Sequence, residues 1–392
     1  MRLCDIGKDG NGGRSPFKSR PRIILFLIAS VLVAGLPVGV CHGQSPSASG
    51  RVTRTRAEIE SLIERVGKTQ PDWWDSVELT YPKSLDLDWP LQPVGDWNAG
   101  RNVGQYIWDI INPNPGRWKE GIKLVHHLMV RHKDDRAKLV RSMDALGRMY
   151  HDLMEDWPRA VFWWRLSAQY GGNVDLIGLA HCYWKLGSKK MAADVLAEIP
   201  FDYTRHGVLI KLWADMGELD KALRLAEQKA ADGMATISYL TAGDACRLAG
   251  RYAEALAYYK KVLTAKAAAG REDDVKKDRE RAQASIQAIR LFDTLDPAQV
   301  PDGTYRADSL AYAGPLHVEV TVKAGRILSV RVSEHQEKQF YSALTETPHQ
   351  IVEKQGVRGV DAVTGATMTS EAIINATAKA LAGGMPKKGQ GR

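Results

Sequence analysis

The chain is poor in cysteine, with four among 392 residues. Cys4 and Cys41 fall in an N-terminal stretch with the layout of an export signal, so the remainder of the chain holds only Cys182 and Cys246. Two cysteines form neither a disulfide framework nor a cysteine-rich metal site, and the Cys-x-x-Cys-His sequence of c-type haem attachment is absent. Both lie within helical patterns, where we expect small buried hydrophobic side chains.

The body of the chain also lacks a strong excess of charge. The formal net charge is +8, but residues 1–22 hold six Lys or Arg and two Asp, and the last eight residues hold three Lys or Arg. An excess of about one positive charge is left for everything between. A nucleic-acid-binding face needs clustered basic residues, so we exclude nucleic acid as a partner.

Residues 1–43 have the layout of an export signal. A basic region that ends at Arg22 precedes an uncharged apolar run, residues 23–40. The small residues before Gln44 suit cleavage, and the run is also long enough to stay as a single membrane anchor. No adjacent arginine pair precedes the run, which favours export of an unfolded chain and a cofactor added outside the cytoplasm. We expect an extracytoplasmic, periplasmic protein, either released or anchored in the membrane.

Residues 44–117 show little periodicity apart from a helical spacing between Arg54 and Val66. The stretch from Pro71 to Pro115 is rich in proline and tryptophan. We expect irregular structure there, with the tryptophans packed against the helices that follow. The alternative is an aromatic platform for a sugar or another ligand. The tryptophans are Trp73, Trp74, Trp89, Trp97 and Trp108.

Residues 118–291 have a helical pattern that repeats. Gly187, Gly217 and Gly250 are 30 and 33 residues apart, and we expect each in the turn between two helices. The alanines five residues further on are Ala192, Ala222 and Ala255. This frame is similar to tetratricopeptide repeats. It predicts an all-α solenoid whose concave surface holds a partner protein, or which serves as a spacer or scaffold.

Three histidines lie close together at the start of this region, His126, His127 and His132. Their spacings of one, five and six residues do not place a pair one helical turn apart, as the four-residue spacing of metal-binding helices does. We therefore do not expect a metal site here.

The composition changes near Pro301, where β-branched residues begin to alternate with polar ones. Residues 317–334 predict a β-hairpin with its turn at Ala324 and Gly325. The residues expected on its core face are Val318, Val320, Val322, Leu328, Val330 and Val332.

Helical patterns at residues 336–344, at residues 351–355 and from Glu371 complete a small α+β domain, residues 302–384. The basic tail, residues 385–392, is expected to be disordered. The whole chain is therefore predicted to be multidomain, with an all-α, tetratricopeptide-like helical solenoid followed by this small α+β domain.

A hydroxyl-rich segment, residues 361–370, leads into the last predicted helix. Gly365 allows a tight backbone turn, and either Ser370 or Thr369 can cap the helix. The unpaired N–H groups and the positive end of the dipole at a helix start can hold a phosphate group.

The same segment resembles the flavinylation motif of FMN-binding domains, as in the C subunit of sodium-pumping NADH:quinone reductase and the G subunit of Rnf complexes. That motif reads Asp, two residues, Ser or Thr, Gly, Ala, Thr. Its five defined positions are filled by Asp361, Thr364, Gly365, Ala366 and Thr367. The resemblance extends over residues 302–383, through the hairpin and its exit.

The resemblance implies FMN bound covalently to Thr367 through a phosphodiester. An exported, magnesium-dependent flavin transferase would attach it and would recognise Asp361 and Gly365. Tyr305 and His335 are candidate contacts of the isoalloxazine ring. No set of catalytic acid, base and nucleophile accompanies the motif, so we expect an electron carrier whose helical repeats dock a redox partner. The alternative is a non-catalytic protein-binding scaffold with an unmodified FMN-binding-like domain.

Overall fold

The structure is a computed structural model. It describes residues 52–89, 98–199, 206–266, 270–292, 295–339, 341–363 and 365–385. The export signal predicted at residues 1–43, Trp97, Thr364 and all of the basic tail but Met385 lie outside the described residues. Residues 1–50 and 51–392 form separate units, and everything below concerns the second. Within its described part, no helix is long and apolar enough to cross a membrane.

The first helix, α1 (Arg56–Gly67), begins at a capping box. The hydroxyl of Thr55 accepts from the N–H of Glu58, and the Glu58 carboxylate accepts from the N–H of Thr55. Ile59 and Ile63 are buried on one face of α1, which packs against α5 (Trp157–Gln169).

The tryptophan-rich segment that follows α1 contains only short helices. These are η1 (Trp74–Ser76), α2 (Val103–Tyr106), η2 (Ile107–Ile111) and η3 (Pro115–Arg117). Trp89 is buried, and its indole N–H donates to the hydroxyl of Ser142 at 2.8 Å. Ser142 belongs to the helix α4, so the prediction that tryptophans of this segment pack on later helices is confirmed for Trp89.

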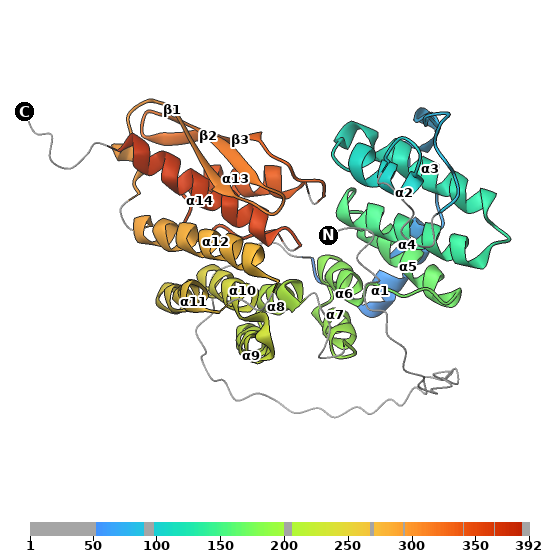
Figure 1. Ribbon diagram of the computed structural model, residues 1–392, viewed down its shortest axis with the longest axis horizontal. Coiled ribbons are helices and arrows are strands. Elements are labelled where there is room, and N and C mark those ends of the chain that lie inside the picture. The colour runs from blue at the N-terminus through green and yellow to red at the C-terminus, as the bar shows by residue number, and fades with distance from the viewer. Residues whose placement is uncertain are drawn as a thin grey trace, which may run out of the picture. The chain divides into compact units, whose positions relative to one another are not determined.

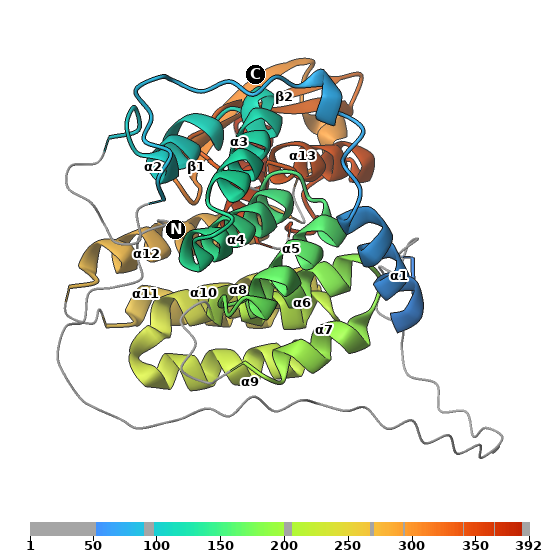
Figure 2. The same ribbon diagram turned by 90° about the vertical axis from the view of Figure 1, so that its right-hand side faces the viewer.

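Helices fill the chain from residue 118 to residue 291. They are α3 (Trp118–Arg131), α4 (Arg136–Asp152), α5, α6 (Leu176–Lys185), α7 (Lys189–Leu196), α8 (His206–Asp215), α9 (Leu219–Lys229), η4 (Ala230–Met234), α10 (Ala235–Leu248), α11 (Tyr252–Thr264) and α12 (Glu272–Leu291). Consecutive helices pack as pairs: α4 with α5, α6 with α7, α8 with α9, and α10 with α11 (Figure 1). In Figure 2, α6, α8 and α10 follow one another in one row, with α7 and α9 in a second row.

The predicted turns between paired helices are confirmed. Gly187, Gly217 and Gly250 lie between the two helices of their pairs, with φ angles of 99°, 77° and 73°. Residues with a Cβ rarely adopt this conformation, which explains the regular placement of glycine. Ala192, Ala222 and Ala255 are fully buried, and so are Cys182 and Cys246.

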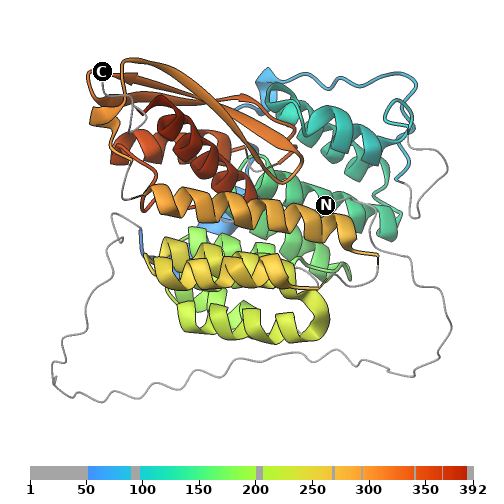
Figure 3. The ribbon, with the colours of Figure 1, turned by 60° about the vertical axis from the view of Figure 1, so that its left-hand side comes forward.

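The C-terminal part is a three-stranded antiparallel sheet covered by two helices. Its strands β1 (Gly303–Leu310), β2 (Pro315–Lys323) and β3 (Arg326–Glu334) pair in chain order. The helix α14 (Thr367–Gly384) packs on β1 and β2, and α13 (Ala343–Lys354) packs on β3. The short helix η5 (Pro297–Gln299) precedes the sheet. Helix α12 lies against α14 and connects this part to α10 and α11 (Figure 3).

The predicted hairpin is confirmed, but one of its core residues is not. Leu328 was expected in the core and is 53% exposed, whereas Ile327 is only 1% exposed. A bulge causes the difference: Val322 pairs with Ile327 while Thr321 pairs with Ser329, so Leu328 has no partner across the strands. The extra residue reverses the alternation at the start of β3.

The helix predicted at residues 336–344 is wrong over most of its range, because α13 begins only at Ala343. The helix predicted at residues 351–355 is confirmed as the C-terminal part of α13. Pro348 lies inside it and removes one backbone hydrogen bond. Ala343, Thr347 and Ile351 form a fully buried stripe at four-residue spacing. The burial of this stripe outweighs the local preference of proline to end a helix.

The bulge predicts that substitutions of the neighbouring residues Ile327 and Leu328 differ in their effect on stability. Ile327→Ala should lower the free energy of unfolding by about 2–4 kcal/mol, because it leaves a cavity in the core. Leu328→Ala is the matched control and should change it by no more than about 0.5 kcal/mol. Urea unfolding followed by circular dichroism measures both. Equal losses, or a larger loss for Leu328→Ala, would contradict the bulge.

Candidate functional site

The helix that follows the motif begins earlier than predicted, at Thr367, and its N-cap residue Ala366 provides no side-chain cap. The prediction that Thr369 or Ser370 caps the helix is wrong, since both are buried in its first turn. The hydroxyl of Ser370 instead accepts two hydrogen bonds. One comes from the N–H of Val363 at 3.0 Å and the other from the hydroxyl of Thr347 at 3.1 Å. Ser370 therefore holds the motif segment against α13.

The start of α14 offers free donors beside Thr367. The first backbone bond runs from the N–H of Ser370 to the carbonyl of Ala366, which leaves the three preceding N–H groups without an acceptor in the helix. Gly365 has a φ of 89°, which turns the chain sharply into this start. Thr367 is partly exposed, and its hydroxyl has no hydrogen-bond partner among the described residues. These features fit an ester-linked phosphate on Thr367.

The segment before the turn is held by side chains from distant helices. The amide of Gln350, on α13, accepts from the N–H of Asp361 at 2.9 Å and donates to its carbonyl at 3.2 Å. The guanidinium of Arg247, on α10, donates to the carbonyl of Val360 at 3.1 Å. The carboxylate of Asp361 is half exposed and lies 3.5 Å from Nζ of Lys211, on α8. Two helices thus fix the backbone before the turn, and a third lies beside the side chain of Asp361.

A buried ion pair joins α10 to α14 directly behind the motif. Arg247 is 1% exposed, and its Nε donates to Glu371 at 3.1 Å, with a second bond from Nη2. Glu371 is 5% exposed and lies in the second turn of α14. Removing a charged pair from water is costly, so its geometry has to be maintained.

Further ionisable groups surround this pair. Lys211 is buried and paired with Asp215, and the buried Asp244 accepts from the hydroxyl of Tyr259 at 2.7 Å. Burial raises the pKa of the Asp244 carboxyl well above its usual range, and the nearby charge of Glu371 raises it further. The sequence analysis missed this cluster, although a lysine at position 211 inside an apolar helix pattern was a signal of a buried charge.

The two candidate ring contacts lie in different places. The hydroxyl of Tyr305 donates to the carbonyl of Pro301, and its ring is so close to Gly384 that a Cβ there would clash. Gly384 ends α14, which has 18 residues and is therefore about 27 Å long, so Tyr305 lies far from Thr367. His335 instead lines a cavity, where its ring meets that of Tyr341 edge-on at 5.4 Å.

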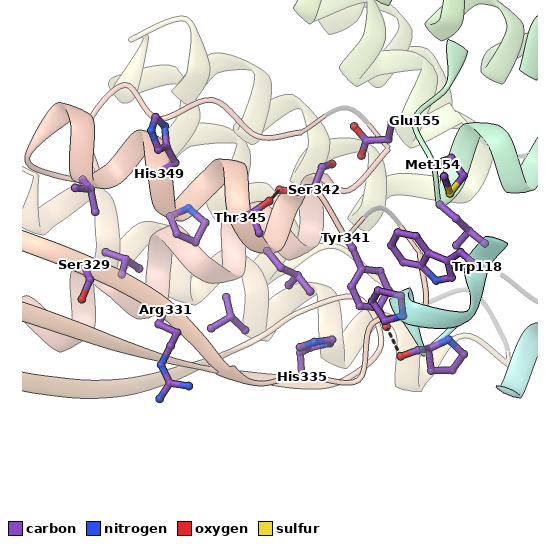
Figure 4. Close-up of a pocket in the computed structure, with 18 of the residues that line it drawn as sticks. Trp118, Met154, Glu155, Ser329, Arg331, His335, Tyr341, Ser342, Thr345 and His349 are labelled. Atoms are coloured by element: carbon purple, nitrogen blue, oxygen red, sulfur yellow. Dashed lines mark hydrogen bonds between the residues drawn. The ribbon is translucent and has the colours of Figure 1, made fainter. Parts of the chain in front are cut away.

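This cavity lies along β3 and α13 and has a volume of about 1030 Å³. Trp118 closes one end of it and meets the ring of Tyr341 edge-on at 5.1 Å (Figure 4). Among the described residues, Thr367 is not part of the wall. The wall includes Ser342, however, which is next to Ala343, and Ala343 packs against Ala366. The cavity and the motif therefore lie on either side of the first turn of α13.

The three histidines of α3 and its C-terminal end do not share a site. The ring of His126 lies against Trp74, that of His127 stacks on Tyr81, and Nε2 of His132 is 2.9 Å from the carbonyl of Leu87. In the part of the chain that the structure describes, no group of three His, Cys, Asp or Glu side chains is arranged to hold a metal ion.

The ion pair behind the motif can be tested by removing one charge. Glu371→Gln leaves Arg247 buried without its counter-charge, and should lower the free energy of unfolding by roughly 3–5 kcal/mol. The control is Glu254→Gln, which breaks the exposed pair of Glu254 with Arg251 and should cost at most about 1 kcal/mol. Urea unfolding of both variants gives the comparison, and similar losses would contradict a buried, essential pair.

The raised pKa of Asp244 predicts a pH dependence. The folded state keeps the Asp244 proton at pH values where the unfolded chain has released it, so this carboxyl destabilises the fold as the pH rises above its ordinary value of 3.8. Asp244→Asn removes the effect and keeps an acceptor for Tyr259. Relative to this variant, the wild type should lose stability between pH 4 and pH 8 in urea unfolding. Parallel stability curves would show that Asp244 titrates normally.

Comparison with known proteins agrees with this geometry. Residues 311–382 match the family model of the FMN-binding domain. The chain is 40% identical over 87 residues to an uncharacterized protein of Treponema pallidum (strain Nichols), a match that covers 22% of this chain and 24% of that protein. The chain thus spans about a quarter of the length of this relative. No solved structure matches the chain. The family match includes β2, β3, α13 and nearly all of α14 with Thr367, so the C-terminal part of the chain carries an FMN-binding domain.

Proposed function

We propose that the protein is an extracytoplasmic electron-transfer flavoprotein that carries FMN through a phosphodiester on Thr367. The observation that carries the proposal is the position of Thr367: a partly exposed hydroxyl, without a partner among the described residues, at the first position of α14. It stands at the end of a complete Asp-x-x-Thr-Gly-Ala-Thr sequence inside the matched family region.

Attachment on Thr367 is a group transfer from FAD. Oγ1 of Thr367 forms a bond to the phosphorus of the FMN half, the pyrophosphate P–O bond breaks, AMP leaves with the bonding electron pair, and the hydroxyl proton passes to a base of the flavin transferase. The open N–H groups and the positive end of α14 then stabilise the phosphodiester charge. Asp361 and Gly365 form part of the surface that the transferase recognises, together with Thr364 and Ala366.

Bound FMN accepts two electrons and releases them one at a time. The chain binds and orients this group. The cavity beside α13 offers apolar and aromatic walls for the isoalloxazine ring, with His335 and Tyr341 among them. Such walls would exclude water from the ring.

The other parts of the chain complete the proposal. Residues 1–43 direct export, with the apolar run either cleaved or retained as a membrane anchor. Residues 118–291 act as tetratricopeptide-like repeats that dock a redox partner protein, and residues 302–384 carry the flavin. The positive φ angles of the three turn glycines and the buried alanines after them support the repeat frame.

The attachment residue is tested by the isosteric substitution Thr367→Val, which removes the hydroxyl and keeps the shape. Wild-type protein produced with a flavin transferase should show a fluorescent band after denaturing electrophoresis and an added mass of FMN less one water. Thr367→Val should lose both completely, because no oxygen is left to form the ester. Thr304→Val is the control, since Thr304 is an exposed threonine on β1 outside the motif, and it should keep both.

Two results would count against the proposal. Flavin retained on Thr367→Val would move the attachment to another residue. A wild type without covalent flavin in the presence of the transferase would favour a protein-binding scaffold with an unmodified domain.

A further inference from the structure

A buried cation of the helical region lies beside the side chain of Asp361. Lys211, on α8, is 2% exposed, and its ammonium group pairs with Asp215, four residues further along the same helix. Nζ of Lys211 also lies 3.5 Å from Oδ1 of Asp361, which is 150 residues away in the sequence. Helix α8 therefore reaches the carboxylate at the first position of the Asp-x-x-Thr-Gly-Ala-Thr motif.

The ammonium group of Lys211 is charged and has a fixed position. Burial alone would lower the pKa of Lys211, but the nearby charges of Asp215 and Asp361 outweigh burial and raise this pKa. The side chain of Asp215 is 5% exposed and binds the ammonium group from within the helix. An exposed lysine loses side-chain freedom when it pairs with a carboxylate, and this loss cancels much of the gain. Lys211 is already confined by burial, so its charge orients Asp361 at little further entropic cost.

The main chain of Asp361 is fixed by a different helix. The side-chain amide of Gln350, on α13, accepts from the N–H of Asp361 at 2.9 Å and donates to its carbonyl at 3.2 Å. These two bonds set the backbone and leave only the side-chain torsions of Asp361 to be determined. Lys211 contacts the carboxylate itself, and the side chain of Asp361 stays half exposed. The carboxylate is therefore oriented from inside the protein and open to a second protein on its outer side.

We propose that Lys211 is a positioning residue for flavin attachment, because it holds the carboxylate of Asp361 in the orientation that the flavin transferase recognises. The inference rests on the proposed function, in which Asp361 belongs to the recognition surface. It gives the helical region a part in the maturation of the domain that carries Thr367. Residues 302–384 alone do not contain Lys211, so the acceptor surface is complete only with α8.

Two variants separate the positioning of Asp361 from a purely structural role of Lys211. Asp215→Asn is the control, which removes the main counter-charge of Lys211 and leaves the ammonium group beside Asp361. Adding Lys211→Met to this variant removes the ammonium group, so the double variant differs from the control at one residue only. A purely structural role would make attachment follow the stability of the fold, which both variants change. Urea unfolding measures that stability and checks that each variant is folded under the assay conditions.

The readout is the rate of flavin attachment by a flavin transferase, with FAD in excess and the concentration of the acceptor protein varied. Asp215→Asn should keep kcat and KM within about twofold of the wild type. The double variant should raise KM for the acceptor protein about tenfold and keep kcat within about twofold, because Asp361 contributes to recognition and not to the transferred group. Equal KM values in the two variants, or a loss confined to kcat, would overturn the proposal.

The wild type separates this inference from the proposed function. A wild type that gains covalent flavin while the two variants share one KM would refute the role of Lys211 and leave Thr367 as the attachment residue. A wild type that gains no flavin would refute both, because no attachment would be left for Lys211 to assist.

A measurement on the unmodified protein covers the case in which the double variant does not fold. In protein with isotope-labelled lysine nitrogens, a buried ammonium group held by carboxylates gives a slowly exchanging NMR signal. One such signal should shift both in Asp215→Asn and in Asp361→Asn, because both carboxylates face Lys211. Asp308→Asn is the control, since it changes an exposed partner of Lys379, and it should leave that signal in place. If no signal responds to both substitutions, Lys211 does not hold Asp361 and the proposal is wrong.

Discussion

The buried ion pair between Arg247 and Glu371 is the constraint on which the rest of the site depends. Its two charges are removed from water, so they are tolerated only while α10 and α14 keep one relative position. The same guanidinium donates to the carbonyl of Val360, which fixes the chain just before the motif. One arginine of the helical region therefore positions both the helix that begins at Thr367 and the segment that leads to it. The helical region thus helps to position the motif segment of the FMN-binding domain.

Charge balance around the pair is achieved with groups from four helices. Lys211 is neutralised by Asp215 and approaches Asp361 at the surface, while burial raises the pKa of Asp244, so this carboxyl keeps its proton to a higher pH than usual. A second buried carboxylate beside Glu371 would leave more negative charge than Arg247 balances. The hydrogen bond from Tyr259 gives Asp244 a partner in the protonated state. The cluster thus couples the stability of the helical region to that of the first turns of α14.

The features that the sequence predicted correctly are local. The hairpin of β2 and β3 follows from alternation with period two, and the glycine turns from the need for a positive φ. The features that it missed depend on contacts far along the chain. Arg247 lies 124 residues from Glu371, and Lys211 lies 150 residues from Asp361. Neither pairing can be predicted from the spacing of apolar residues within a single helix or strand.

The wrong predictions have the same origin. Leu328 has the right residue type and parity for the core, but the bulge adds one residue that a strict alternation does not contain. The sequence analysis placed two separate helices where α13 continues through Pro348, and it expected Thr369 or Ser370 to cap the last helix. The buried stripe of α13 retains the proline within a helix, and the contact with Thr347 turns the serine inward. Tertiary packing decided all three cases.

Under the proposed function, these contacts reconcile two opposite demands on Thr367. A residue that carries a group has to be accessible to the enzyme that attaches it, yet a bound redox group is useful only if its position is fixed. Different residues meet the two demands. The hydroxyl of Thr367 stays accessible, whereas the backbone of Val360, Asp361 and Val363 is hydrogen-bonded by side chains of α10, α13 and α14. The backbone of the motif is therefore fixed before any modification, and the proposed transferase would meet a surface of defined shape. Loosening Ser370 or Arg247 would disturb that surface without touching Thr367, the proposed attachment residue.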